Sequence, residues 1–136
     1  MSQENVEIVR RAYSAGFRRP KPDYGTVNEL FDPDHELLSF ISSVEGRRFR
    51  GALGFREWLS DMDQAWESWE AKWERTTDVD EERVLAVMEV KTHSRMAGIP
   101  LKRDIFFIST VREGQVVRTE SYPGLAEAIE AAGLSE

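Results

Sequence analysis

The spacing of apolar residues changes part-way along the chain, and this change constrains the fold more than any other feature. Before Trp69 the apolar residues recur mostly at helical spacing, which predicts helices over residues 2–17, 24–31 and 52–69 and one strand over residues 35–42. From Trp69 onward they alternate, which predicts strands over residues 69–79, 83–96, 101–111 and 116–122 before a closing helix over residues 124–134. This order predicts an α+β domain: a curved antiparallel sheet, shaped as a cone, wrapped around the N-terminal helices and one long helix. A cone of this kind encloses a cavity, which is where a ligand site is expected.

The length and charge of the chain exclude several classes of protein. Its 136 residues predict a single domain over residues 1–136. The absence of cysteine excludes a disulfide scaffold and a zinc–thiolate site. A net charge of −7 argues against nucleic acid as a partner, because phosphate binding requires a basic surface. No apolar run is long enough to span a membrane and the first residues lack the core of a secretory signal, so we expect a cytoplasmic protein with no membrane partner.

The strand over residues 83–96 has two different faces. Successive side chains of a strand point to opposite sides, so Met88, Val90, Thr92 and Ser94 share one face and Glu89, Lys91, His93 and Arg95 share the other. We interpret the first face as the cavity side and the second as the solvated side, because a mixed-charge face rarely marks a catalytic cluster. The same alternation places Val117, Thr119 and Ser121 on the inner face of the last strand.

The stretch DIFFIS is apolar on both faces. Ile105 and Phe107 lie on one side, and Phe106 and Ile108 lie on the other. A strand that is apolar on both faces is buried on both. The outer side needs a cover, and we expect a second copy of the chain to supply it, in a homodimer formed through the outer face of the sheet.

Six stretches of the chain together resemble the SnoaL-like branch of the nuclear transport factor two-like (ketosteroid isomerase-like) superfamily. They are ENVEIVRRAYSAGF, LFDPDHELL, RGALGFREWL, VMEVKTHSRMAGIPL, VREGQVVRTESY and EAIEAAGL, and they extend over nearly the whole chain. The resemblance implies a cone-shaped α+β barrel, usually a homodimer, with a cavity for a small apolar molecule. The superfamily includes isomerases, cyclases, epoxide hydrolases, dehydratases and proteins without known activity, and the fold alone does not choose among them.

The resemblance also indicates where catalytic residues would lie. A ketosteroid isomerase-like site needs a tyrosine, an aspartate base and a protonated acid, and these positions fall at Tyr13, Ser39 and Phe107. Serine and phenylalanine cannot act as the base or the acid, although Asp104 lies within the error of the last alignment. The histidine of a SnoaL-type cyclase also falls near Phe107.

The epoxide hydrolase pattern is no better matched. Its arginine and aspartates fall at Val90, Thr92 and Ser121. Shifting the alignment by one residue would bring in charged side chains but would also turn the apolar face outward, so we reject that register.

Three residues remain as catalytic candidates, and each has a simpler structural interpretation. Tyr13 could donate a hydrogen bond to a ligand oxygen, or it could be a core residue whose hydroxyl is satisfied locally. His35 could move a proton in the cavity, because its ordinary pKa lies near neutrality, or it could bond to a backbone carbonyl at the mouth of its strand. Asp104 could be a buried acid with a raised pKa, or it could pair with the adjacent Lys102 and Arg103.

The sequence thus leaves several functions open. The first is binding of a small apolar or aromatic molecule without a cofactor or metal. The second is a cofactor-free isomerase, a polyketide cyclase-like enzyme or an epoxide hydrolase-like enzyme that uses Tyr13 with His35 or Asp104. The third is a purely structural module, which a cone filled by tryptophans would favour. The side chains expected to line the pocket are Leu37, Ser39, Trp58, Trp66, Met88, Val90, Thr92, Phe107, Ser109, Thr119 and Ser121.

Overall fold

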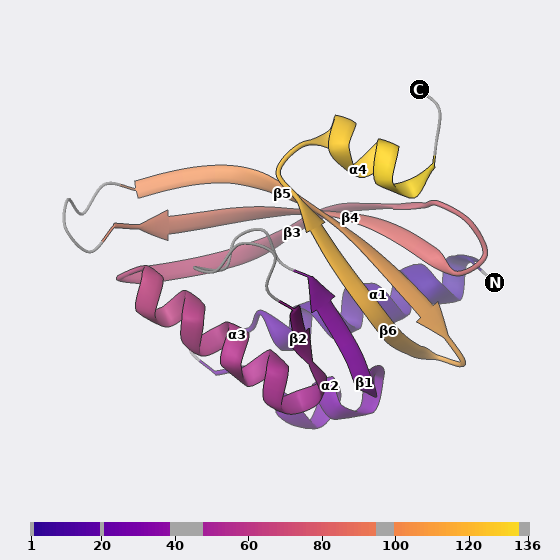
Figure 1. Cartoon of the computed structure of the whole chain (residues 1–136), viewed down its shortest axis with the longest axis horizontal. Helices are drawn as coiled ribbons and strands as arrows, with labels where there is room; N and C mark the ends of the chain where they lie inside the picture. The colour runs from indigo at the N-terminus through magenta and orange to yellow at the C-terminus, as the bar shows by residue number, and fades with distance from the viewer. Residues whose placement is uncertain (1, 20, 39–47, 95–99, 134–136) are drawn as a thin grey trace.

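The computed structural model describes residues 2–19, 21–38, 48–94 and 100–133 (Figure 1). Its helices are α1 (Ser2–Gly16), α2 (Tyr24–Leu30), α3 (Gly51–Ala65) and α4 (Leu125–Ala132). Its strands are β1 (Phe31–Leu38), β2 (Arg48–Arg50), β3 (Ser68–Asp78), β4 (Arg83–His93), β5 (Pro100–Arg112) and β6 (Gln115–Tyr122). None of the helices in these ranges is long and apolar enough to cross a membrane.

The strands form one curved sheet in the order β2-β1-β6-β5-β4-β3. The α+β class is as predicted, but the sheet is mixed rather than antiparallel, because β1 pairs with β6 in parallel. The cause is the long excursion between them: the chain leaves β1, builds β2 and α3, and then adds β3 to β6 in succession from the far edge. The last strand therefore arrives beside β1 running in the same direction.

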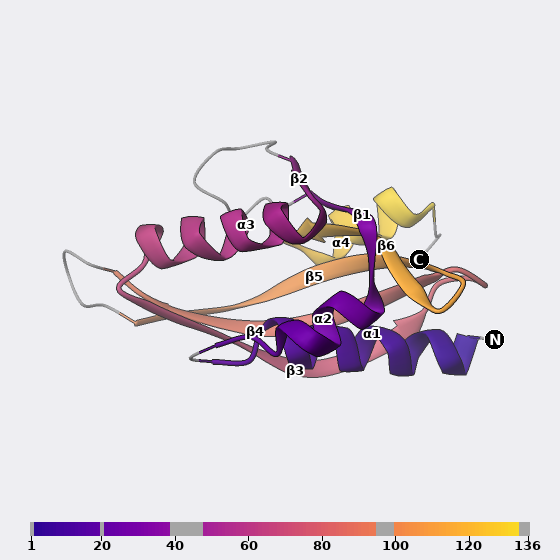
Figure 2. The same ribbon diagram turned by 90° about the horizontal axis from the view of Figure 1, so that it is seen from below.

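Helices α1, α2 and α3 lie on the inner side of the sheet, below it in Figure 1 and facing the viewer in Figure 2. The inner stripe of α1, with Val9, Ala12 and Tyr13, packs against the inward-facing residues of the sheet, such as Met88 and Phe107. These side chains are almost wholly removed from water, and burial of apolar area is the main force that holds the helix to the sheet. The predicted inner face is therefore confirmed for Met88, Val90 and Phe107.

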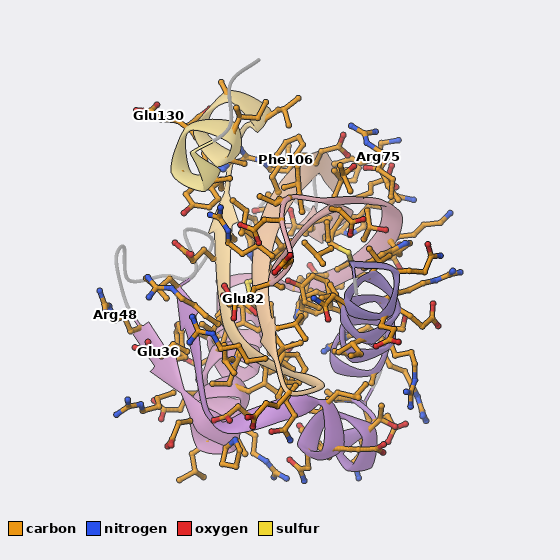
Figure 3. The ribbon with its side chains drawn as sticks, turned by 90° about the vertical axis from the view of Figure 1, so that its right-hand side faces the viewer. Glu36, Arg48, Arg75, Glu82, Phe106 and Glu130 are labelled. Carbon is orange, nitrogen blue, oxygen red and sulfur yellow. The ribbon has the colours of Figure 1, made fainter. Side chains whose placement is uncertain are left out.

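Helix α4 lies on the opposite, outer side of the sheet (Figure 1). Its buried residues Ala128 and Ala132 pack against Phe106 and Ile108 of β5, together with Val87 of β4. Figure 3 shows Phe106 beside this helix. The reason for expecting a partner subunit was therefore wrong, because the chain itself covers the outer apolar patch; the homodimer stays a prediction.

Bulges and helix ends account for the local differences from the predicted elements. Helix α3 ends at Ala65, so Trp66 caps it from an extended backbone, and β3 begins at Ser68. In β6 the pairing shifts by one residue, because Val111 pairs with Val116 while Thr110 pairs with Arg118. The extra residue is Val117, so Val116 takes the core position that we expected for Val117.

Candidate functional site

A small chamber lies inside the cone between α1, α3 and the inner face of the sheet. Its volume is about 20 Å³, which is room for about one water molecule. The cone is therefore largely filled by side chains instead of forming the open cavity that we expected. The residues that line this inner chamber are mostly aromatic: Ala12, Tyr13, Gly16, Phe17, Phe31, His35, Leu37, Phe55, Trp58, Phe107 and Thr119.

Four buried polar side chains form a connected group at the wall of the inner chamber. The Tyr13 hydroxyl forms a hydrogen bond with the Ser109 hydroxyl, and the Thr119 hydroxyl is a second hydrogen-bonding neighbour of Tyr13. The Thr119 Oγ1 atom lies 2.9 Å from Nε2 of His35. We call Tyr13, Ser109, Thr119 and His35 the polar chain.

The fold brings these four residues together from four different elements. Tyr13 belongs to the inner stripe of α1. Ser109 of β5 and Thr119 of β6 are directly opposite each other in the antiparallel register, so their side chains point to the same face. His35 lies on β1, which pairs with β6 and so places its ring beside Thr119. The short hydroxyl side chains leave space that aromatic residues at the same positions would fill.

The polar chain is electrically neutral near pH 7, and burial moves the pKa values of its two titratable groups further from neutrality. Burial raises the pKa of the Tyr13 hydroxyl well above its ordinary value, and the hydrogen bonds from Ser109 and Thr119 offset only part of this effect. Burial also lowers the pKa of His35 from 6.5 to about 4, against a smaller opposing effect of the Asp32 carboxylate. Near neutral pH the site therefore contains an un-ionised phenol, two hydroxyls and an uncharged imidazole.

A larger space lies just outside the inner chamber, where α2, β1 and the first turn of α3 meet. We call it the outer hollow; its volume is about 260 Å³. Three residues, Phe31, His35 and Phe55, line both the outer hollow and the inner chamber, so they form the wall between the two. The other residues around the outer hollow are Val27, Asn28, Asp32, Pro33, Gly51 and Ala52. Among the described residues that line the hollow, Asp32 is the one charged side chain.

The largest concave region among the described residues lies elsewhere. It is an open groove of about 1270 Å³ along the β5–β6 turn, the β3–β4 turn and the start of α1. Carboxylates predominate in its lining, and two of them already bind arginines: Asp80 pairs with Arg83, and Glu82 pairs with Arg112. None of the polar side chains among its described lining residues is buried, unlike those of the polar chain, so the inner chamber and outer hollow remain the better candidate site.

No protein-family model and no curated protein matches the sequence. Solved structures match it over nearly its whole length. TerC, co-crystallised with polyporic acid, has 19% sequence identity and a TM-score of 0.73, with 96% of this chain and 98% of TerC covered. A putative SnoaL-like polyketide cyclase from Jannaschia sp. CCS1 has 15% identity and a TM-score of 0.73, with 99% of this chain and 95% of that chain covered.

A hypothetical protein with a ketosteroid isomerase-like fold from Catenulispora acidiphila, in complex with trimethylamine, matches as well. It has 16% identity and a TM-score of 0.68, with 95% of this chain and 94% of that chain covered. The chain has the SnoaL-like cone fold. The resemblance predicted from the six sequence stretches is therefore confirmed for the architecture, while identities this low leave the activity of the chain open.

Within this cone fold, most of the expected pocket residues lie on the inner side, but fewer line the chamber. Leu37, Trp58, Phe107 and Thr119 line it directly. Ser109 reaches it through its bond to Tyr13, whereas Trp66 is only half-buried after the end of α3. Ser39 lies outside the described residues. The remaining expected residues, Met88, Val90, Thr92 and Ser121, are buried on the inner face without lining the chamber.

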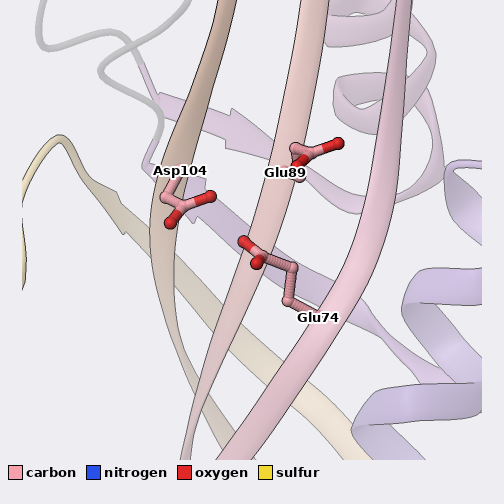
Figure 4. A group of neighbouring side chains, drawn as sticks. All are labelled: Glu74, Glu89 and Asp104. Atoms are coloured by element: carbon pink, nitrogen blue, oxygen red, sulfur yellow. The ribbon is translucent and has the colours of Figure 1, made fainter.

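The position of Asp104 corrects one catalytic prediction. Asp104 is exposed and pairs in register with Glu89 on the outer face of the sheet, on the opposite side from Tyr13. Figure 4 shows it beside Glu89 and Glu74, and one carboxylate oxygen from each lies within 4.8 Å of the others. A hydrogen bond with Asp104 is the main cause that raises the pKa of Glu74. Asp104 cannot act in the cavity, so Tyr13 and His35 remain as the candidates.

Phe31 and Phe55, which line both the inner chamber and the outer hollow, were not predicted to belong to the site. Phe31 ends the helix predicted over residues 24–31, and Phe55 belongs to the apolar stripe of the helix predicted over residues 52–69. Their rings in fact stack on each other, with centroids 6.2 Å apart and planes inclined by 20°. The stack depends on β1 lying close to the start of α3, and the pairing of β1 with β2, which directly precedes α3, brings this about.

Proposed function

We propose that the chain binds a small, neutral, planar molecule, apolar or aromatic, in the space formed by the inner chamber and the outer hollow. The polar chain carries this proposal, because it places neutral hydrogen-bonding groups at the closed end of an aromatic-lined space. A ligand carbonyl or hydroxyl would bond to Tyr13 or His35, while its ring would pack among the aromatic walls. The two solved structures that contain polyporic acid and trimethylamine support uptake of organic molecules by this fold.

The charge state of the polar chain favours binding over proton transfer. An efficient general acid or base has a pKa near the working pH. Burial moves the pKa of Tyr13 upward and that of His35 down to about 4, so both move away from neutrality. Neutral donors and acceptors suit a neutral ligand, and the carboxylate of Asp32 in the outer hollow disfavours an anionic one.

The test is a titration with menadione, a neutral planar quinone, followed by quenching of tryptophan fluorescence. Tyr13→Phe and His35→Ala should each weaken binding by about tenfold, which corresponds to the loss of one buried hydrogen bond. Tyr122→Phe and His93→Ala are matched controls, because Tyr122 and His93 lie outside the inner chamber. Both control variants should bind menadione like the unaltered protein. Equal binding by all four variants would contradict the proposal.

A cofactor-free enzyme remains the second candidate, and the bond between His35 and Thr119 favours it. Through Thr119 the imidazole is connected to the Tyr13 hydroxyl, so Tyr13 could polarise a substrate carbonyl while His35 moves the proton. This arrangement would suit an isomerase, a polyketide cyclase-like or an epoxide hydrolase-like reaction. Turnover of a ketone or epoxide that disappears in Tyr13→Phe and His35→Ala would establish it and displace the binding proposal.

The homodimer, the single domain over residues 1–136 and the cytoplasmic location stay proposals. The homodimer would use the part of the outer face that α4 leaves uncovered, where charged residues of β3, β4 and β5 predominate. Light scattering at micromolar concentration tests it: twice the chain mass of 15.6 kDa supports a dimer, and the mass of a single chain excludes it.

A further inference from the structure

Two stacked phenylalanines separate the inner chamber from the outer hollow. Phe31 and Phe55 line both spaces, and so does His35, which is tied to Thr119 by its Nε2 atom. The phenylalanine rings have no such bond and are held by ring contacts. The movable part of the wall is therefore aromatic and apolar.

Phe55 lies in the middle of a row of parallel rings. Its ring stacks on Phe31, with centroids 6.2 Å apart and planes inclined by 20°. On its other side it stacks on Trp58, again at 6.2 Å and inclined by 19°. A planar ring held between two parallel aromatic faces is the arrangement in which a protein binds a flat ligand.

The surroundings of Phe55 allow its ring to leave this position. The ring end rests over Gly16, where an added Cβ atom would lie 3.2 Å from Cζ. On the other side the outer hollow offers about 260 Å³ of space. A ring in a close-packed core needs adjacent empty volume in order to move, and Phe55 has it.

The backbone near Phe31 is also irregularly paired. The pairing of β1 with β6 is interrupted between Phe31 and Glu36, and Pro33 in this segment has no N–H to donate. Fewer ladder hydrogen bonds lower the free energy needed for local movement. Both partners in the stack can therefore adjust when a ligand enters.

We propose that Phe55 occupies, in the empty protein, the place of a ligand ring and sets the size and class of ligand that the cone admits. The proposal deepens the binding function given above and rests on it. A ligand ring displaces the Phe55 side chain into the outer hollow and stacks between Phe31 and Trp58 in its place. The ligand is then a neutral planar ring whose oxygen substituent reaches the polar chain at Tyr13.

The test compares binding of phenol, a single ring with one hydroxyl, to the unaltered protein and to Phe55→Ala. Phe55→Ala should bind phenol about tenfold or more tightly, because the ligand no longer has to break two aromatic stacks. Adding Tyr13→Phe should remove most of this gain. Phe49→Ala is the matched control, since Phe49 is buried in the same apolar cluster but lines neither the inner chamber nor the outer hollow.

The binding results separate the role of Phe55 from the binding function itself. If the unaltered protein binds menadione but Phe55→Ala gains no more for phenol than Phe49→Ala, the role of Phe55 is overturned and the binding function stands. If only Phe55→Ala binds, and Tyr13 is required, Phe55 fills the ring position permanently and the binding function fails. If neither protein binds either probe, both proposals are overturned.

A second measurement covers the case in which Phe55→Ala does not fold. Phe55→Leu keeps most of the apolar volume without a flat ring, and its folding is checked by a cooperative urea transition. In the unaltered sequence, 4-fluorophenylalanine at position 55 reports the ring directly by ¹⁹F NMR. Addition of menadione should shift its resonance, and an unchanged resonance under saturating menadione would overturn the displacement of Phe55.

Discussion

Lowering the pH from about 7.5 to about 5 should destabilise the protein through His35. The ring is 4% exposed, and burial lowers its pKa from 6.5 to about 4, with the nearby Asp32 carboxylate opposing part of the effect. Between these two pKa values the unfolded chain binds a proton at His35 and the folded chain does not, so stability falls as the pH falls. The stabilisation from the neutral ring is fully present above pH 6.5 and is lost as the pH falls toward 4.

The size of the effect follows from the two pKa values. The full difference corresponds to about 3 kcal/mol, at about 1.4 kcal/mol for each pKa unit. At about pH 5 roughly 2 kcal/mol of it should already be lost. Carboxylates also titrate in this pH range, so the contribution of His35 to the pH dependence of stability must be separated from theirs.

Urea denaturation of the unaltered protein and of His35→Gln at several pH values makes that separation. Glutamine can still bond to Thr119 but does not titrate, so the difference between the two unfolding free energies should change by about 2 kcal/mol between about pH 7.5 and about pH 5. His93→Gln should keep the pH dependence of the unaltered protein, because His35 is still present. Parallel curves for the unaltered protein and His35→Gln would refute the view that His35 is held neutral by burial.

Three further predictions concern the walls of the site and the outer face of the sheet. Gly16→Ala should be tolerated or should stabilise the protein by at most about 1 kcal/mol, because alanine favours the helix and the Phe55 ring can yield. Gly54→Ala should instead cost about 1–3 kcal/mol, because its Cβ would lie 2.7 Å from the backbone of Phe49. Urea denaturation that ranks the two variants in the opposite order would contradict a movable Phe55. Ser109→Ala should cost about 1–3 kcal/mol of stability, because it leaves the buried Tyr13 hydroxyl with one partner fewer. The double variant of Ser109→Ala and Tyr13→Phe should lose less stability than the two single variants added together. Additive losses in the same denaturation assay would show that the bond between Tyr13 and Ser109 contributes nothing. Asp104→Asn should return the pKa of Glu74 toward its ordinary value, as followed by NMR titration of the Glu74 carboxyl. Menadione binding should stay unchanged in this variant, and a change in binding would show that the outer face affects the chamber.

The sequence predicted those parts of the fold that depend on a regular hydrophobic period. Val90, Thr92 and Ser121 are buried on the inner face and Lys91 is on the outer face, as the chosen register requires. The register could be predicted because a slip of one residue would expose every apolar side chain of the strand. The same argument rejected the shifted epoxide hydrolase alignment, and the structure places Glu89, Lys91 and His93 on the outer face.

The errors arose where a single residue or a distant segment decides the outcome. The bulge at Val117 places Val116 on the inner face in place of Val117, and two adjacent valines have the same apolar character, so the sequence cannot tell which one faces inward. The cover over Phe106 comes from α4, and the alternation within β5 carries no information about which segment packs on it. Asp104 was expected in the cavity from an alignment uncertain by a few residues, although alternation from Ile105 would have placed it outside.

The size of the cavity was beyond sequence reasoning for a different reason. Tyr13, Trp58 and Phe107 were predicted as core or wall residues, but whether such rings surround a space or fill it depends on their rotamers. The neutral state of His35 was equally hidden, because it depends on burial by residues that are distant in the sequence.

A crystal structure of the protein grown with menadione tests the central claim most directly. The account predicts the quinone between Phe31 and Trp58, with an oxygen within hydrogen-bond distance of the Tyr13 hydroxyl or His35 and with the Phe55 ring moved into the outer hollow. Menadione bound only at another surface, with the inner chamber still filled by Phe55, would contradict it.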